Sequence, residues 1–145
     1  MIVDQARFIA ENIAQIMDDG SQTKFTIIAH STGSLVAYKA MQYKNFPANL
    51  LMNVFNLAGP LAEAPQQLSA DVQALLDEVI EGYDSRRFSH VANFNFNGGP
   101  RDQLVPHHIT SFSRFTERYA SVADNFYALG TLEMRNVFES IDHGS

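Results

Sequence analysis

The chain has 145 residues, the usual size of a single domain, so residues 1–145 are expected to form one globular unit. Hydrophobic residues make up 46% and charged residues 18%, a balance that excludes disorder over most of the length. Sixteen acidic against ten basic residues give a net charge of -6, which argues against binding to a nucleic-acid backbone. The absence of cysteine excludes disulfides, thiolate nucleophiles and cysteine-ligated zinc.

Nothing in the sequence resembles a membrane span or a leader. No apolar run approaches the roughly 18 residues of a transmembrane helix. The first residues lack the basic region and apolar stretch of a signal peptide. The chain taken alone is therefore expected to be soluble.

The first half of the chain predicts two helices around a strand. A first helix is expected to start near Asp4 and to stop at residues 18–20. Its apolar residues recur at spacings of three and four and should share one face: Phe8, Ile9, Ile13, Ile16 and Met17. Residues 24–29 form a nearly continuous apolar run, which indicates a buried strand of a parallel sheet. A second helix should cover residues 35–43.

The second half continues the alternation. Strands are predicted at residues 50–58 and 90–97, with a helix over residues 69–83 between them. The signal at residues 109–130 is mixed and fits one helix or two short ones, and residues 134–141 are a possible fourth strand. This alternation predicts an α/β fold, a mostly parallel sheet with helices on both faces.

The most informative local feature is Ser31, which lies between the first predicted strand and the second helix. Ala29 and Gly33 flank it at two positions on either side, a near match to the nucleophile elbow Gly-x-Ser-x-Gly. Small residues are expected there because larger side chains would collide with the backbone of the tight turn. The alternative interpretation is that Ser31 is only the N-cap of the following helix. His30 is expected to line the site rather than to act as its base.

A nucleophilic serine needs a base, and that base needs an orienting acid. Asp102, in a loop past the end of a predicted strand, is the candidate acid, although it could also stabilise a turn or pair with Arg101. His143 is the candidate base. The order Ser, Asp, His is that of α/β-hydrolases.

Other histidines compete for the role of base, namely His30, His90, His107 and His108. The last two are neighbours, but adjacent residues on an extended chain point to opposite faces. No carboxylate at helical spacing joins them. No metal and no cofactor are therefore predicted.

The motifs together resemble the GPI inositol-deacylase family of α/β-hydrolase serine esterases. The resemblance rests on Ala-His-Ser-Thr-Gly-Ser-Leu-Val-Ala at residues 29–37 and on the apolar strand at residues 51–57. Ala-Gly-Pro follows this strand at residues 58–60, where family members usually carry a Thr-Pro-His-like turn. The resemblance rests also on Gly-Gly-Pro-Arg-Asp-Gln-Leu-Val-Pro at residues 98–106, which is similar to the family's Gly-Gly-x-Arg-Asp-x-x-Val loop. Ser-Ile-Asp-His at residues 140–143 resembles the family's Ser-x-Asp-His.

Carried over position by position, the resemblance implies nucleophile Ser31, acid Asp102 and base His143, with the Thr32 backbone amide as an oxyanion donor. It implies a three-layer α/β-hydrolase fold. The implied substrate is the acyl chain on the inositol of the GPI anchor of proteins in the endoplasmic reticulum. Family members are multi-pass membrane proteins whose hydrolase domain faces the lumen.

Compared with the family, the sequence starts at the helix before the nucleophile strand and stops two residues after His143. The expectation is a partial α/β-hydrolase domain that lacks the amino-terminal strands and one oxyanion-hole loop, with one apolar sheet edge exposed. Three alternatives to an active deacylase remain. They are a catalytically impaired fragment that needs a partner or missing segment to fold, a general lipase or thioesterase, and a binding module.

Overall fold

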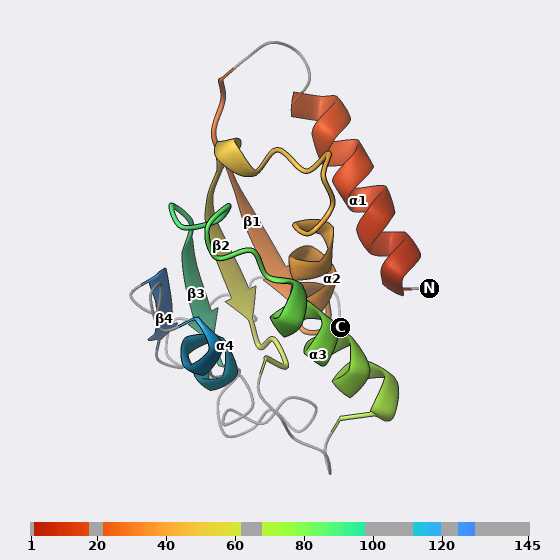
Figure 1. The fold of residues 1–145 in the computed structure, drawn as a ribbon, viewed down its shortest axis with the longest axis vertical. Helices are drawn as coiled ribbons and strands as arrows, with labels where there is room; N and C mark the ends of the chain where they lie inside the picture. Colours follow the sequence, from red (N-terminus) through yellow and green to blue (C-terminus); the bar gives the residue numbers. More distant parts are fainter. Residues whose placement is uncertain (1, 18–21, 62–67, 98–111, 120–124, 130–145) are drawn as a thin grey trace, which may run out of the picture.

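Helices and strands alternate along the chain (Figure 1). The computed structural model describes residues 2–17, 22–61, 68–97, 112–119 and 125–129. In chain order the elements are α1 (Ile2–Met17), β1 (Phe25–His30), α2 (Gly33–Ala40), the short 3-10 helix η1 (Ala48–Leu50), β2 (Leu51–Leu57), α3 (Ala70–Gly82), β3 (Ala92–Phe96), α4 (Ser113–Arg118) and β4 (Phe126–Leu129).

The four strands form one parallel sheet in the order β1-β2-β3-β4. Parallel neighbours need crossover connections, and α2, α3 and α4 lie in the three connections. This confirms the predicted α/β class with a parallel sheet. All carboxyl ends of the strands meet at one edge, where functional sites of open α/β sheets collect.

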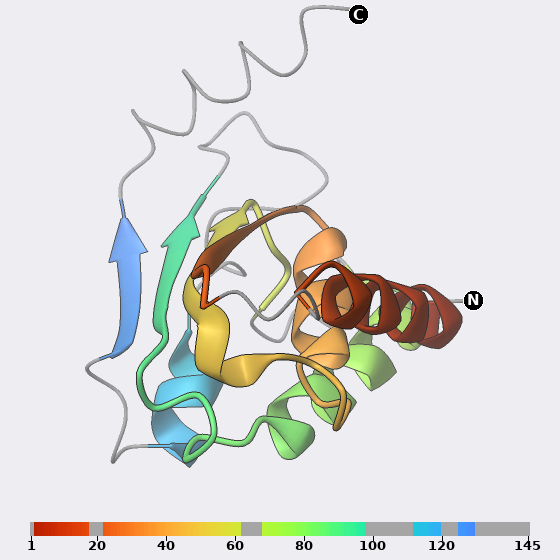
Figure 2. The ribbon, with the colours of Figure 1, turned by 90° about the horizontal axis from the view of Figure 1, so that it is seen from above.

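The helices α1 to α4 lie on the same side of the sheet (Figure 2). In β2 and β3, alternate residues point to that side and are buried, as at Val54, Asn56, Asn93 and Asn95. The predicted helices on the other face do not occur within the described residues. There, a row of register partners crosses all four strands: Ile28, Phe55, Phe94 and Tyr127. Ile28 is 71% and Tyr127 44% exposed.

The elements around β1, the edge strand of the described sheet, are more exposed than the sequence predicts. The first helix is confirmed, but it begins at Ile2, so Asp4 lies in its first turn and is not its cap. Its buried positions are Ala6 and Ala10, whereas Phe8 is 66% and Ile16 68% exposed. The predicted buried strand is β1, yet it lies at the edge of the sheet, and its apolar residues are only partly covered.

The later elements correct one prediction. The predicted helix over residues 69–83 is α3, and the Ser69 hydroxyl accepts a hydrogen bond from the Val72 amide as its N-cap. The segment 109–130, predicted to hold only helix, contains α4 and also the fourth strand β4. The alternative fourth strand at residues 134–141 lies outside the described residues.

Candidate active site

Ser31 occupies a sharp turn between β1 and α2. Its backbone φ is 55°, the left-handed region that non-glycine residues rarely adopt. The Ser31 amide donates to the Leu57 carbonyl oxygen at 2.8 Å, so the serine extends the β1–β2 ladder by one residue before the chain turns into the helix. This strand, strained serine and helix have the local geometry of a nucleophile elbow.

The start of α2 contradicts the interpretation of Ser31 as a helix cap. The N-cap residue is Thr32, with φ -62° and ψ -16°, and its side chain makes no capping hydrogen bond to the described residues. The first bonds of the turn run from the Ser34 and Leu35 amides to the carbonyl oxygens of Ser31 and Thr32. The Thr32 amide precedes these first bonds, at the end of the helix where amides lack intrahelical acceptors.

We expected a side chain at position 33 to collide with the backbone of the turn, and this expectation is wrong for the described residues. A Cβ atom built on Gly33 meets nothing within 4 Å. The space belongs to a groove of about 440 Å³ between α1, β1 and α2, which Gly33 and His30 line near the serine. The rest of its wall is mainly apolar and includes four isoleucines: Ile9, Ile13, Ile27 and Ile28.

A second strained turn lies beside the elbow, at the end of β2. Ala58 has φ 54°, and its amide donates to the Phe96 carbonyl oxygen at 2.7 Å. Gly59 then approaches α2 so closely that a Cβ on it would lie 2.5 Å from the Ser34 hydroxyl oxygen. Sequence reasoning missed this contact, and the only signal for it was the Ala-Gly-Pro that ends the strand.

The structure brings together three of the predicted site residues at the carboxyl edge. Ser31 is half-buried, and its neighbours His30 and Thr32 are exposed. Asp102 and His143 lie outside the described residues, as do the competing His107 and His108.

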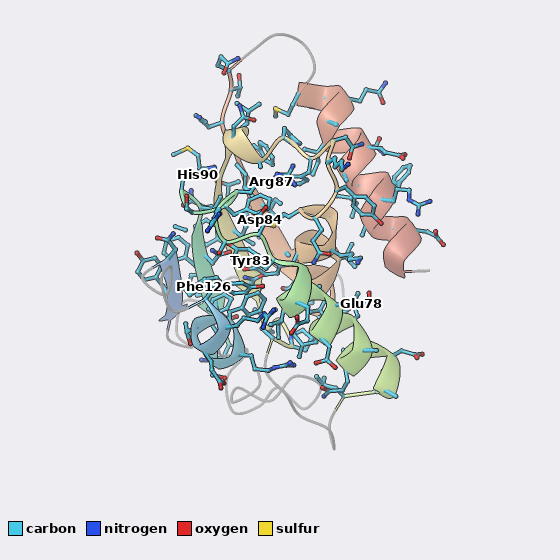
Figure 3. All side chains as sticks on the ribbon, in the orientation of Figure 1. Glu78, Tyr83, Asp84, Arg87, His90 and Phe126 are labelled. Atoms are coloured by element: carbon cyan, nitrogen blue, oxygen red, sulfur yellow. The ribbon has the colours of Figure 1, made fainter. Side chains whose placement is uncertain are left out.

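His90 is excluded as the base by its position. It precedes β3 and therefore lies at the amino edge of the sheet (Figure 3), whereas Ser31 follows β1 at the carboxyl edge. Its Nε2 lies 2.9 Å from the Ala48 carbonyl oxygen, which is a structural contact.

The fold and the turn define a parallel α/β protein of the kind that carries a serine on a strand-to-helix elbow. Among the described helices, none is long and apolar enough to cross a bilayer. The chain belongs to the PGAP1-like alpha/beta domain family, whose model matches residues 1–145.

The relatives found are proteins named GPI inositol-deacylase. Those of Emericella nidulans and Aspergillus fumigatus are each 24% identical over 164 residues, covering 98% of this chain and 14% of the relative. That of Debaryomyces hansenii is 22% identical, covering 98% of this chain and 15% of the relative. The chain thus spans about one-seventh of the length of these relatives.

Proposed function

We propose that the chain carries the nucleophile of a serine ester hydrolase, with Ser31 as that nucleophile. The observation that carries the proposal is the left-handed backbone of Ser31 at the carboxyl end of β1. Such strain costs on the order of 1–3 kcal/mol and collects at functional sites. Ala58 has the same backbone conformation without a nucleophilic side chain, so the proposal rests on the strained turn together with the Ser31 hydroxyl.

The proposed chemistry is acyl transfer to the serine and then to water. Ser31 Oγ bonds to the acyl carbonyl carbon while His143 takes its proton, and Asp102 holds the imidazolium. The Thr32 amide stabilises the oxyanion. His143 returns the proton to the leaving alcohol oxygen as the ester bond breaks. Water then releases the fatty acid from the acyl-enzyme by the same steps.

The proposed substrate is the acyl chain on the inositol of a GPI anchor. Membership of the family and the names of the relatives support this choice. GPI-anchored proteins or their lipid esters would then be the partners, and the endoplasmic reticulum membrane the location. The net charge of -6 gives no reason to propose a nucleic acid as a further partner.

A fluorophosphonate probe tests for the activated serine. Wild type should be labelled, whereas Ser31→Ala should not, and Asp102→Asn and His143→Ala should be labelled much more slowly. Ser89→Ala, an exposed serine at the other end of the molecule, is the matched control and should be labelled like wild type. Wild type labelled no faster than Ser31→Ala would refute the proposal.

A general lipase or thioesterase is the alternative activity, because a fold does not determine the substrate. Acyl-inositol, thioester and simple lipid esters should be compared by kcat/KM. Preference for the thioester would replace the deacylase assignment and leave Ser31 as the nucleophile.

The second alternative is a catalytically impaired fragment, and the bare face of the sheet favours it. The β1 edge and the row from Ile28 to Tyr127 have no covering helix among the described elements. Such apolar surfaces mark interaction or aggregation sites. A monodisperse monomer of residues 1–145 that unfolds cooperatively in urea would reject this alternative.

A further inference from the structure

A buried hydrogen-bond network joins α2 to two strands of the sheet. The Tyr38 hydroxyl donates to Asn93 Oδ1 in β3 at 2.7 Å and accepts from Asn56 Nδ2 in β2 at 3.0 Å. Asn93 Nδ2 then donates to the backbone carbonyl oxygens of Val91 and Asn125, at 3.3 and 3.4 Å. All three side chains that form the network are almost fully buried.

These hydrogen bonds are directional contacts between α2 and the sheet; elsewhere α2 is held by apolar packing and by the Lys39–Glu78 ion pair to α3. α2 has eight residues, and its other large buried side chains, Leu35 and Val36, are aliphatic. Apolar burial depends on area and not on direction, so it resists a small slide of the helix only weakly. Two short bonds to neighbouring strands determine where the helix sits along the sheet.

The network connects the segments that carry the proposed nucleophile and acid. Ser31 lies two positions before the start of α2, and Asp102 lies six positions after the end of β3. We propose that Tyr38 is a positioning residue, whose hydroxyl holds the Ser31 elbow in register with the strand that leads to Asp102. Its catalytic consequence rests on the proposed function.

The surroundings of Tyr38 allow the hydroxyl to be removed alone. Its ring packs against Phe115 and Tyr83, with centroids 5.4 and 6.0 Å apart, and Tyr83 in turn packs against Phe126 (Figure 3). In Tyr38→Phe the ring keeps these neighbours, whereas Asn93 Oδ1 and Asn56 Nδ2 lose their hydrogen bonds to the Tyr38 hydroxyl. The change therefore removes both hydrogen bonds from the Tyr38 hydroxyl to the strands without opening a cavity.

Tyr119→Phe is the matched control. It also removes a tyrosine hydroxyl that donates to a buried segment, here to the Ile80 carbonyl oxygen of α3, away from the network. Displacing a catalytic group by about 1 Å costs about 100-fold, so fluorophosphonate labelling of Ser31 should slow by about 10- to 100-fold in Tyr38→Phe. In Tyr119→Phe it should change by less than about twofold. With an ester substrate, kcat should fall and KM should stay near the wild-type value.

Hydrogen exchange gives a readout that does not need activity. The Ser34 and Leu35 amides, which close the elbow, should exchange faster in Tyr38→Phe than in Tyr119→Phe once both are compared at equal global stability. If Tyr38→Phe fails to fold, Asn56→Ala removes one of the two bonds and should show the same effect to a smaller degree.

The two proposals fail separately. Absence of labelling in wild type rejects the serine hydrolase, and exchange alone then decides the role of Tyr38. Equal exchange in Tyr38→Phe and Tyr119→Phe, or wild-type labelling in Tyr38→Phe, overturns the positioning role.

Discussion

Ser31 and Ala58 occupy equivalent positions after neighbouring parallel strands, and their φ values are 55° and 54°. Each amide adds one more hydrogen bond to the strand beside it, Ser31 to Leu57 and Ala58 to Phe96. After each of these two residues the backbone turns away from the sheet at its carboxyl edge. The edge that holds the proposed nucleophile is thus built from two strained turns, not one.

The strain at Ser31 predicts a stabilising substitution that destroys the site. Glycine adopts positive φ without steric cost, so Ser31→Gly should raise the free energy of unfolding by about 0.5–1 kcal/mol while abolishing fluorophosphonate labelling. Ala58→Gly is the control: relief of strain there is offset by the loss of a buried methyl, and labelling should persist. Urea unfolding measures both. If Ser31→Gly unfolds more easily than wild type, the backbone of Ser31 is not strained.

Because Gly59 lies so close to Ser34, we expect a methyl group added at position 59 to destabilise the fold. In Gly59→Ala the new Cβ would lie 2.5 Å from Ser34 Oγ and 2.8 Å from Ser34 Cβ, so unfolding free energy should fall by about 1–3 kcal/mol. Ser34 Oγ is buried and has no hydrogen-bond partner among the described residues, so Ser34→Ala should be close to neutral. The double variant Gly59→Ala, Ser34→Gly should recover part of the unfolding free energy that Gly59→Ala loses. If the changes in unfolding free energy of the two single variants simply add in the double variant, the contact between Gly59 and Ser34 is refuted.

The sequence predicted the alternation of elements and the serine turn because both depend on short-range patterns. Ser69 as a cap and the apolar run of β1 are local signals. The exposure of Ile28 and Phe8 was not predictable, because periodicity tells which residues share a face and not what covers that face. β4 was missed for a related reason: four residues next to a short helix carry too weak an alternation to separate strand from loop.

The residues that hold Tyr38 were also beyond sequence reasoning. Asparagine is depleted in strands, so in the sequence Asn56 and Asn93 only weaken the strand pattern and give no sign of a hydrogen-bond network. Only the three-dimensional arrangement shows that both amides meet one hydroxyl.

We expect that lysine cannot replace arginine at position 87. The Arg87 guanidinium donates to the carbonyl oxygens of Met41, Tyr43 and Phe46, closing the segment between α2 and β2 (Figure 3). A lysine ammonium lacks the planar fork that reaches all three acceptors. Arg87→Lys should therefore lower the unfolding free energy by about 1.5–3 kcal/mol, measured in urea. Arg86→Lys, an exposed neighbour, should change it by less than about 0.5 kcal/mol, and equal losses would contradict this role.

Ile28 tests whether the bare face of the sheet is solvent-exposed in solution. Threonine keeps the β-branched shape, so Ile28→Thr should change stability by less than about 0.5 kcal/mol if the 71% exposure holds. Binding of a fluorescent apolar dye should fall. Val54→Thr, on the buried side of the next strand, should instead cost about 1–3 kcal/mol because its hydroxyl would have no partner. A large loss in Ile28→Thr would show that another segment or a second copy covers this face.

Burial of Tyr83 predicts that the fold weakens in alkali. Burial raises the pKa of Tyr83 from 10.0 to about 12, and burial also raises the pKa of Tyr38. Below pH 10 both groups are neutral in the folded and unfolded chains, so this contribution to stability is complete. Between pH 10 and about 12 the unfolded chain releases the proton first, and the unfolding free energy should fall by up to about 1.4 kcal/mol per pH unit for Tyr83. Urea unfolding at several pH values should give a shallower decline for Tyr83→Phe than for wild type. Identical slopes for the two proteins would mean that the phenol is hydrated, and that the aromatic cluster around Tyr38 is more open than its packing indicates.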